Sequence, residues 1–545
     1  MVRHGRLSKG CSTCRRRRIK CDQANPACGQ CNKAGWKCPQ YTDSVERMFQ
    51  HHEMKDPIKS RDRSHPRSKA LVQPGIIYPL FTRELEPLTS NNKNTTNTTS
   101  TLDISCENVP LLNRCREITQ PLNDRAIDFF FAAYVVRDSP GQLRGYYEYL
   151  STMRDVHHMD KAFSTSLGAA ALAAYSRAFR YPALLDAARK QFGTALNLVK
   201  TAISSRQEAI KDSTVISVLL LNTFSTVTRE TLQSLWDCHV HLSGGAMTLL
   251  KLRGPAQLET HHGLQLFLQI WWSVSQSYLF RSTRIPEELI ELRRCAAETL
   301  DTNDPGWQLS DIFVRLADFR ADVQDGKFHG HDSVVKEALV LDHELLSLAA
   351  TMPMEWQFET ILLREISEFV FGTSYHEYPD FWVTFIWNNI RTCRIFLHRE
   401  VLKQLKDVLS SSSLDPHPSY TLAISCQLSE STEVLRRLAV DMCATIPQYF
   451  SSSSTPSHTS LGMTKEPFVS ERQGLPGSPM NNNVPLCAGV CLLLWPILIA
   501  GRMAASDAQR GYLARSFRFL GWRTGIEQAF TLASVLESSE CIGLI

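Results

Sequence analysis

The sequence predicts three parts: a small metal-stabilised N-terminal module with two short helices, a disordered linker, and a large all-α C-terminal domain. Six of the 16 cysteines lie between Cys11 and Cys38. A low-complexity run of Ser, Asn and Thr, Ser90–Thr101, interrupts a polar segment that cannot bury a core. From about Arg125 onward, apolar residues recur at helical spacing. A chain of 545 residues also exceeds one ordinary core. We therefore expect a module at 1–41, a linker at 42–120 and a helical domain at 121–545.

The cysteines of the module form an array that repeats itself. The pattern C-x2-C-x6-C occurs twice, with six residues between the copies. No apolar secretory signal precedes the array, so we expect a reducing compartment, where clustered cysteines act as metal ligands. The predicted ligands are Cys11, Cys14, Cys21, Cys28, Cys31 and Cys38. An iron–sulfur cluster has the same ligand type, but its common spacings differ.

Six thiolates can hold two zinc ions if two sulfurs bridge, because tetrahedral zinc takes four ligands. The repeat allows three symmetric bridging pairs, which are Cys11 with Cys28, Cys14 with Cys31, or Cys21 with Cys38. Cys14 and Cys21 would lie about 10 Å apart along one continuous helix. Two sulfurs on one zinc are only about 3.8 Å apart. The helix that starts at Ser12 must therefore end near Arg18 so that the chain can fold back to Cys21.

The positive charge of the chain is concentrated in the module. Residues 1–41 contain ten Lys or Arg and one acid, a net +9, whereas the whole chain is only +4 and the remainder is therefore −5. A basic module on a mildly acidic body is typical of a nucleic-acid-binding protein. The first half of the array is the more basic, and the predicted DNA contacts are Lys9, Arg15, Arg16, Arg17, Arg18 and Lys20. The arginine run could also serve nuclear import or solvation alone.

The segments Cys11–Asp22 and Cys28–Cys38, with Arg15–Arg18 between the second and third cysteines, resemble the fungal binuclear zinc cluster family. The resemblance implies two zinc ions per chain, bridged by Cys11 and Cys28. It further implies that Cys14 and Cys21 complete one zinc, and Cys31 and Cys38 the other. It implies recognition of CGG-like triplets in double-stranded DNA, usually two, with a spacing set by the linker and a homodimer. The family usually has Lys where this chain has Arg18, a change that keeps the charge.

The body after the linker is predicted to be helical throughout, because alternating strand patterns are scarce. Ser-rich stretches at Ser410–Ser413 and Ser451–Asn483 are expected to be exposed loops. The predicted helical stretches are Ala126–Val136, Leu184–Ile203, Val215–Phe224, Leu264–Leu279, Val335–Ala350, Phe381–Leu405, Ile424–Ile446, Pro485–Ala500 and Gly521–Leu536.

Val484–Gly501 is 18 residues without a charge, at the lower limit for a membrane span. Its two prolines and its weak basic flank favour a buried core helix instead. We therefore expect no membrane association.

The body also resembles the fungal-specific transcription factor domain that follows such clusters. The stretches that carry this resemblance are Ala171–Tyr175, Trp236–Met247, Leu249–Gly254, Cys443–Gln448 and Leu494–Leu498. It implies a nuclear regulator of RNA polymerase II transcription that works with the transcription machinery or co-regulators. The alternatives are an enzyme, or a redox or metal-sensing protein, with a zinc-stabilised appendage. No nucleophile elbow, P-loop or dinucleotide motif is present in the sequence, and a structural role is expected for His239 and His241.

Overall fold

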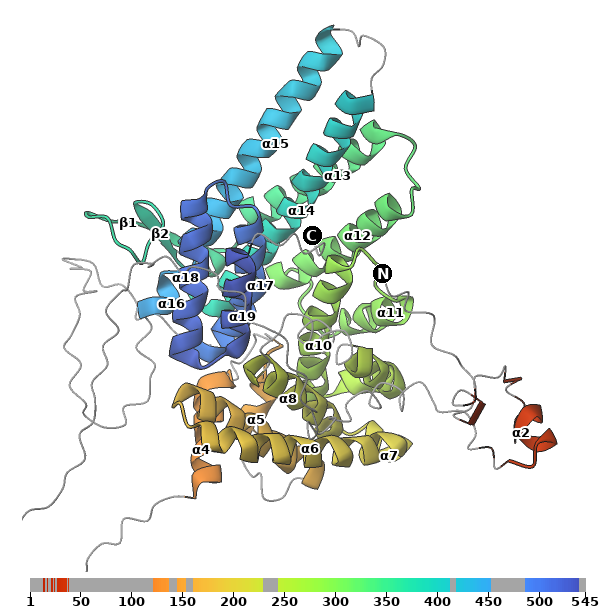
Figure 1. The fold of residues 1–545 in the computed structure, drawn as a ribbon. Coiled ribbons are helices and arrows are strands. Elements are labelled where there is room, and N and C mark those ends of the chain that lie inside the picture. The colour runs from red at the N-terminus through yellow and green to blue at the C-terminus, as the bar shows by residue number, and fades with distance from the viewer. Residues whose placement is uncertain are drawn as a thin grey trace, which may run out of the picture. The chain divides into compact units, whose positions relative to one another are not determined.

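The structure is a computed structural model, and two parts of it are described separately. The first is the cysteine segment, with residues 13, 14, 17, 21, 22, 24, 27–36 and 38. The second is the helical domain, with residues 121–136, 145–152, 160–228, 244–411, 418–451 and 486–538 (Figure 1). The predicted linker and most of the loop predicted at Ser451–Asn483 lie outside these residues, and so does the His239 and His241 pair.

The helical domain begins with helices packed around α5 (Lys161–Ala178). Asp160 starts α5 by accepting a hydrogen bond from the Phe163 amide at 2.8 Å. The alanine-rich centre of α5 is buried on all sides, which allows close approach of α4 (Leu122–Tyr134), α6 (Pro182–Ser204) and α8 (Asp212–Thr228). These helices form the layer that Figure 1 colours orange to yellow.

The middle of the domain is a series of neighbouring helices. In chain order its elements are α7 (Arg206–Ala209), helical residues 244–253, η4 (Pro255–Glu259), α10 (His261–Phe280), α11 (Glu287–Ala296), α12 (Pro305–Gln324) and α13 (His331–Ala350). The short η2 (Glu148–Thr152) packs on α10. Helix α10 contacts α8 on one side and α12 on the other, so it joins the first layer to the next. Its Trp271 is almost completely buried.

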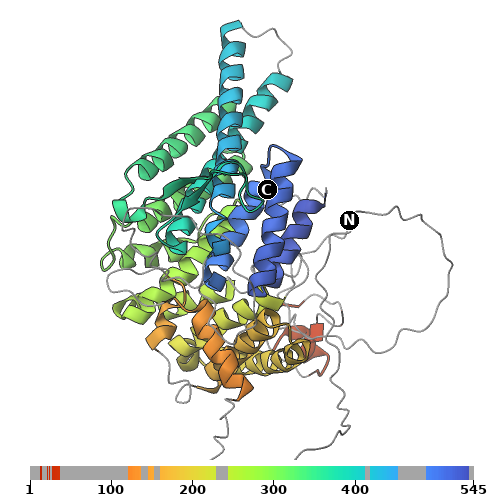
Figure 2. The ribbon, with the colours of Figure 1, turned by 90° about the vertical axis from the view of Figure 1, so that its left-hand side faces the viewer.

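Two long helices follow, and they pack side by side. They are α14 (Phe381–Ser411) and α15 (Pro418–Ala444), with α13 against the other side of α14. Their far ends extend beyond the surrounding helices, as Figure 2 shows from a second side. Before them lie η5 (Met354–Trp356) and a two-stranded antiparallel hairpin of β1 (Glu359–Leu362) and β2 (Ser374–Glu377), in which Thr360 pairs with His376.

The last helices return to the first layer. After α16 (Gln448–Ser451) come α17 (Leu486–Arg502), α18 (Asp507–Thr524) and α19 (Glu527–Glu537). Helix α17 packs on α4 and α14, α18 packs on α5, and α19 packs on α8. Figure 2 shows these blue helices directly above the orange and yellow ones. One apolar core therefore runs through the domain from α4 to α19.

The mainly helical body predicted from the sequence agrees with this architecture, with three corrections. The β1–β2 hairpin is not helical. Ser410 and Ser411 belong to α14 and not to a loop. The single predicted stretch Gly521–Leu536 is two helices, because Gly525 ends α18 with φ +74°.

Helix α17 confirms the buried helix that was predicted for Val484–Gly501, within the residues described. Its core-facing residues are buried against six other helices, which are α4, α14, α15, α16, α18 and α19, and Pro496 is tolerated inside it. Across the described residues, no helix is long and apolar enough to cross a membrane.

Candidate metal centre

The second half of the cysteine array folds around the short helix α2 (Gly29–Lys33). Cys28 stands at its N-cap, where its Sγ accepts a hydrogen bond from the Cys31 amide at 3.4 Å. After the helix, Gly35 turns the chain with φ +65°, and the Trp36 amide donates to the Cys31 carbonyl at 2.8 Å. This tight turn places Cys28 and Cys31 on the same side of the helix start.

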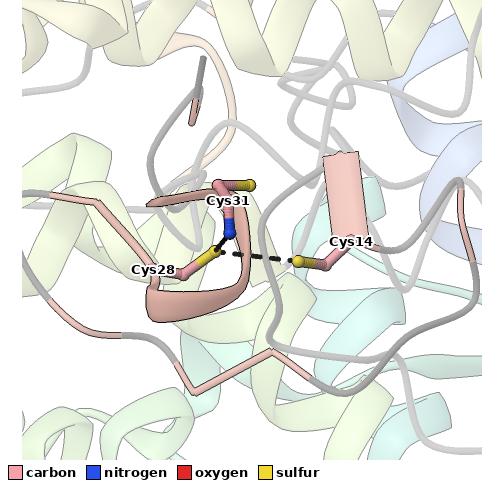
Figure 3. A group of neighbouring side chains, drawn as sticks. All are labelled: Cys14, Cys28 and Cys31. Carbon is pink, nitrogen blue, oxygen red and sulfur yellow. Dashed lines mark hydrogen bonds between the residues drawn. The ribbon is translucent and has the colours of Figure 1, made fainter. Parts of the chain in front are cut away.

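Three cysteine sulfurs converge at this point. Cys14, Cys28 and Cys31 are fully buried, and their sulfurs all lie within 4.8 Å of one another. The Sγ atoms of Cys14 and Cys28 are 3.7 Å apart (Figure 3). Two thiolates on one tetrahedral zinc are about 3.8 Å apart, since each Zn–S bond is about 2.3 Å. The Cys14 and Cys28 sulfurs are therefore spaced as two ligands of one metal ion are.

Cys28 belongs to a second group of donor atoms as well. Its sulfur, the Cys21 sulfur and an Asp22 carboxylate oxygen also lie within 4.8 Å of one another. Cys28 is thus close to the ligands of both halves of the array, as a bridging sulfur must be. The half-buried Cys21 and Cys38 pack against the buried cysteines.

Asp22 anchors the chain where it enters the second half. Both of its carboxylate oxygens accept from the Gly29 amide at 3.0 Å. A Cβ atom on Gly29 would lie 2.5 Å from the Asp22 Oδ2 atom, so any larger residue would force the Asp22 carboxylate to shift. The sequence-based interpretation did not assign Asp22 a role. Its position directly after Cys21 was the only available signal.

The two halves of the array are also joined through an aromatic contact. The Arg17 amide donates to the Thr13 carbonyl at 3.2 Å, which is a helical hydrogen bond. Arg17 lies one helical turn after Thr13. Its guanidinium carbon is 3.9 Å from the centre of the Trp36 ring. This cation–π contact holds the first helix against the second half. Sequence reasoning did not predict this role for Trp36.

Among the predicted DNA contacts, Arg17 is the one that the described residues include, and it is exposed. Lys9, Arg15, Arg16, Arg18 and Lys20 lie outside these residues, as does Cys11. The structure thus brings together Cys14, Cys21, Cys28 and Cys31, with Cys38 packed beside them.

The cysteines of the helical domain have a different character. Cys393, Cys443 and Cys487 are buried in the apolar core. Burial raises the pKa of Cys443 to about 12, and it raises the pKa of Cys393 still further. Such thiols stay protonated near neutral pH and are poor metal ligands. Within the described ranges, the donor groups suited to a metal all lie in the cysteine segment.

Comparison with known proteins finds similar sequences for the cysteine segment. Residues 9–48 match the family described as "Fungal Zn(2)-Cys(6) binuclear cluster domain". A similar segment occurs in the transcriptional regulatory protein moc3 of Schizosaccharomyces pombe, 49% identical over 43 residues. The aspercryptin biosynthesis cluster-specific transcription regulator atnN of Emericella nidulans is 53% identical over 38 residues. The sterol uptake control protein 2 of Candida albicans is 40% identical over 46 residues.

These similarities are confined to the cysteine segment. They cover 8%, 7% and 8% of this chain, and 8%, 6% and 6% of the respective relatives. No solved structure gives a match. The repeated cysteine spacing, the convergent sulfurs and the family match agree on one assignment. Within residues 9–48, this chain carries a zinc-binding cluster domain of the fungal Zn(2)-Cys(6) type.

Proposed function

We propose that the protein is a nuclear, sequence-specific DNA-binding transcription regulator that acts on RNA polymerase II genes. In this proposal the cluster domain binds CGG-like triplets in double-stranded DNA. The observation that carries the proposal is the convergence of buried cysteine sulfurs within a segment that matches the fungal cluster family. Each of the similar proteins is named as a transcription regulator or a control protein. The net charge of +9 in residues 1–41 suits a phosphate backbone.

The domain would hold two zinc ions, with Cys11 and Cys28 as the bridging ligands. The position of Cys28 in both donor groups supports this assignment. When bound, zinc supplies the folding energy of so small a module and performs no chemistry on a substrate. Metal analysis of the purified protein tests the count. Two zinc ions per chain are expected, and one zinc or iron would contradict the bridged arrangement.

The basic side chains of the first half would divide into two tasks. Arg17 stacks on Trp36 and so fixes the first helix to the domain. In this proposal Arg18 would reach base edges in the major groove and pair with guanine. Arg15 and Lys20 would bind phosphates, with Lys9 and Arg16 adding to the positive surface.

Substitutions of Arg18 and Lys20 test this division. Arg18→Ala is expected to cost about 1–3 kcal/mol on a CGG-type site and little on random DNA, because a guanine contact carries sequence information. Lys20→Ala should weaken binding to both DNAs. It should also reduce, by about one unit, the slope with which the logarithm of the binding constant falls with the logarithm of the salt concentration. Binding of both variants to both DNAs, measured at several salt concentrations, distinguishes a base contact from a phosphate contact. Equal weakening of both DNAs by Arg18→Ala would show that Arg18 does not read bases.

The helical domain, proposed to span 121–545, would then serve as a fungal-specific transcription factor regulatory domain. It would support homodimers and contacts with co-regulators, with 42–120 as the linker to the DNA-binding part at 1–41. The alternative, a redox protein with a zinc appendage, needs reactive thiols in the body. The raised pKa values of the buried Cys393 and Cys443 disfavour that role. Sequence-specific DNA binding that is lost after zinc chelation would support the regulator and count against the redox protein.

A further inference from the structure

A cavity of about 150 Å³, partly open to solvent, lies in the helical domain where helices that are distant in the sequence meet. Its wall is built from α8, α10, α14, α17 and α19, together with residues 145–147. A space of this size holds one small, ring-sized molecule. Because both ends of the domain contribute to the wall, the cavity exists only when the whole domain is folded.

The side chains that line the cavity are partly aromatic, and the described ones carry no formal charge. Its aromatic wall consists of Trp272, Trp382, Phe385 and Trp495. Among the described residues that line it, there is no Asp, Glu, Lys, Arg or His. Burial raises the pKa of the Tyr146 hydroxyl well above its ordinary value and that of the Cys491 thiol to about 11, so both groups are neutral at pH 7. A charged ligand would lose its hydration here without gaining a counter-charge.

Amide side chains supply the polar part of the wall. They are Asn222, Gln269, Gln276 and Gln528. Gln269 is only 8% exposed and Gln528 only 6%. Gln269 Oε1 accepts from the Tyr147 amide and the Tyr149 hydroxyl, whereas among the residues that the structure describes no hydrogen bond is made by the Gln528 amide. Buried amides normally have hydrogen-bond partners, so the Gln528 amide is available to a molecule that enters the cavity.

One wall of the cavity is held in place by hydrogen bonds. Tyr147 has φ +57°, a conformation that a non-glycine residue adopts only when its surroundings impose it. Its amide donates to Gln269 Oε1 at 2.9 Å, and its hydroxyl donates to the Leu219 carbonyl at 2.9 Å. Gly145 lies so close to α10 that a Cβ would be 2.7 Å from the Leu268 Cβ. The cavity is therefore preformed.

We propose that this cavity is a binding site for a small, uncharged molecule with a flat ring and an amide-like group that both donates and accepts hydrogen bonds. The ring packs between the aromatic side chains, and the polar group pairs with Gln269 and Gln528. This site is independent of the DNA-binding function, because it lies wholly within the helical domain.

Benzamide and benzoate test the proposal, because they share a shape and differ in charge. Calorimetric titration of the full chain is expected to show saturable one-to-one binding of benzamide. Benzoate should bind at least about tenfold more weakly, since its charge finds no partner. Absence of saturable benzamide binding at millimolar concentrations, or equal affinity for benzoate, would overturn the proposal.

Variants then locate the site. Gln528→Leu should weaken benzamide binding at least about tenfold, because it removes a buried hydrogen-bond partner. Gln324→Leu, at an exposed position at the end of α12, is the matched control and should bind as the unmodified protein does. Ser273→Phe should abolish binding by filling the cavity, with circular dichroism to check folding. Unchanged binding in a folded Gln528→Leu or Ser273→Phe variant would place benzamide elsewhere and refute the assignment.

Discussion

Cys28 is the residue on which the geometry of the cluster domain depends most. It caps α2, it lies 3.7 Å from the Cys14 sulfur, and it belongs to both groups of donor atoms. A terminal ligand would belong to only one of these groups. Loss of Cys28 should therefore affect both metal ions and not one.

Cys28→Ser is expected to lower the zinc content from two ions to none and to abolish DNA binding. The reason is that metal binding supplies the folding energy of such a module. Cys426→Ser, at an exposed position in α15, is the control and should keep both ions. Zinc content is measured by atomic absorption on the purified variants. A Cys28→Ser protein that retains two zinc ions would contradict the bridging role.

His376 in β2 shows how burial can make one side chain sensitive to pH. Burial, with the positive charge of Arg391 nearby, lowers the pKa of His376 to about 3. In the unfolded chain its pKa is about 6.5. Between these values the unfolded state binds a proton that the folded state does not. The free energy of unfolding should therefore fall as the pH drops from about 6.5 toward 3.

From pH 7 to pH 5, His376 is expected to lower the stability of the helical domain by about 2 kcal/mol. Urea unfolding followed by circular dichroism at both pH values measures this change. His376→Gln should remove that share of the pH dependence, whereas His329→Gln, at an exposed position, should not. An unaltered pH dependence in His376→Gln would show that another group is responsible.

At the scale of elements, the long helix α14 is joined to α13 by a buried ion pair. Arg394 on α14 donates to the two carboxylate oxygens of Asp342 on α13 at 2.7 and 3.1 Å. Burial acts to raise the pKa of Asp342, but the adjacent His398 and Arg394 side chains outweigh burial and hold the pKa below its ordinary value. The pair therefore orients the two helices within an otherwise apolar contact.

Asp342→Ala is expected to destabilise the helical domain by about 3–5 kcal/mol, because it leaves the Arg394 charge buried without its partner. Urea unfolding of the variant measures the loss. Glu433→Ala, which breaks an exposed pair with Arg436 within α15, provides the comparison and should have a much smaller effect. A similar decrease in the free energy of unfolding in both variants would show that burial does not make the Asp342–Arg394 pair more important for stability than an exposed pair.

At the scale of the whole molecule, metal dependence is expected to be confined to the cluster domain. Zinc chelation should abolish DNA binding while the urea midpoint of the helical domain stays unchanged, because the described core of that domain is apolar and contains no metal-binding group. Circular dichroism and DNA binding, measured on one chelated sample, test this. A lowered midpoint after chelation would reveal a metal in the helical domain.

The boundary between sequence-based prediction and structure is clear at α18 and α19. Gly521–Leu536 has one continuous helical period, yet the chain turns at Gly525. A Cβ at Gly525 would lie 2.5 Å from the backbone of Arg177 and Ala178 on α5. Glycine is thus required at this turn both by its positive φ and by the closeness of α5, and periodicity records neither. The β1–β2 hairpin was missed because each strand has only four residues, too few for an alternating pattern to stand out.

The sequence by itself determined the cluster domain, because metal ligation depends on the type of side chain and on spacing within fewer than 30 residues. It also determined that the body is mainly helical and that the uncharged segment near residue 490 is buried, since both follow from local composition. Only the tertiary structure decided the contact of Asp22 with Gly29, the stacking of Arg17 on Trp36 and the cavity between Gln269 and Gln528. Each of these features joins residues that only folding brings together. A local sequence pattern shows which face of a helix is apolar, but it does not show which residues pack against that face.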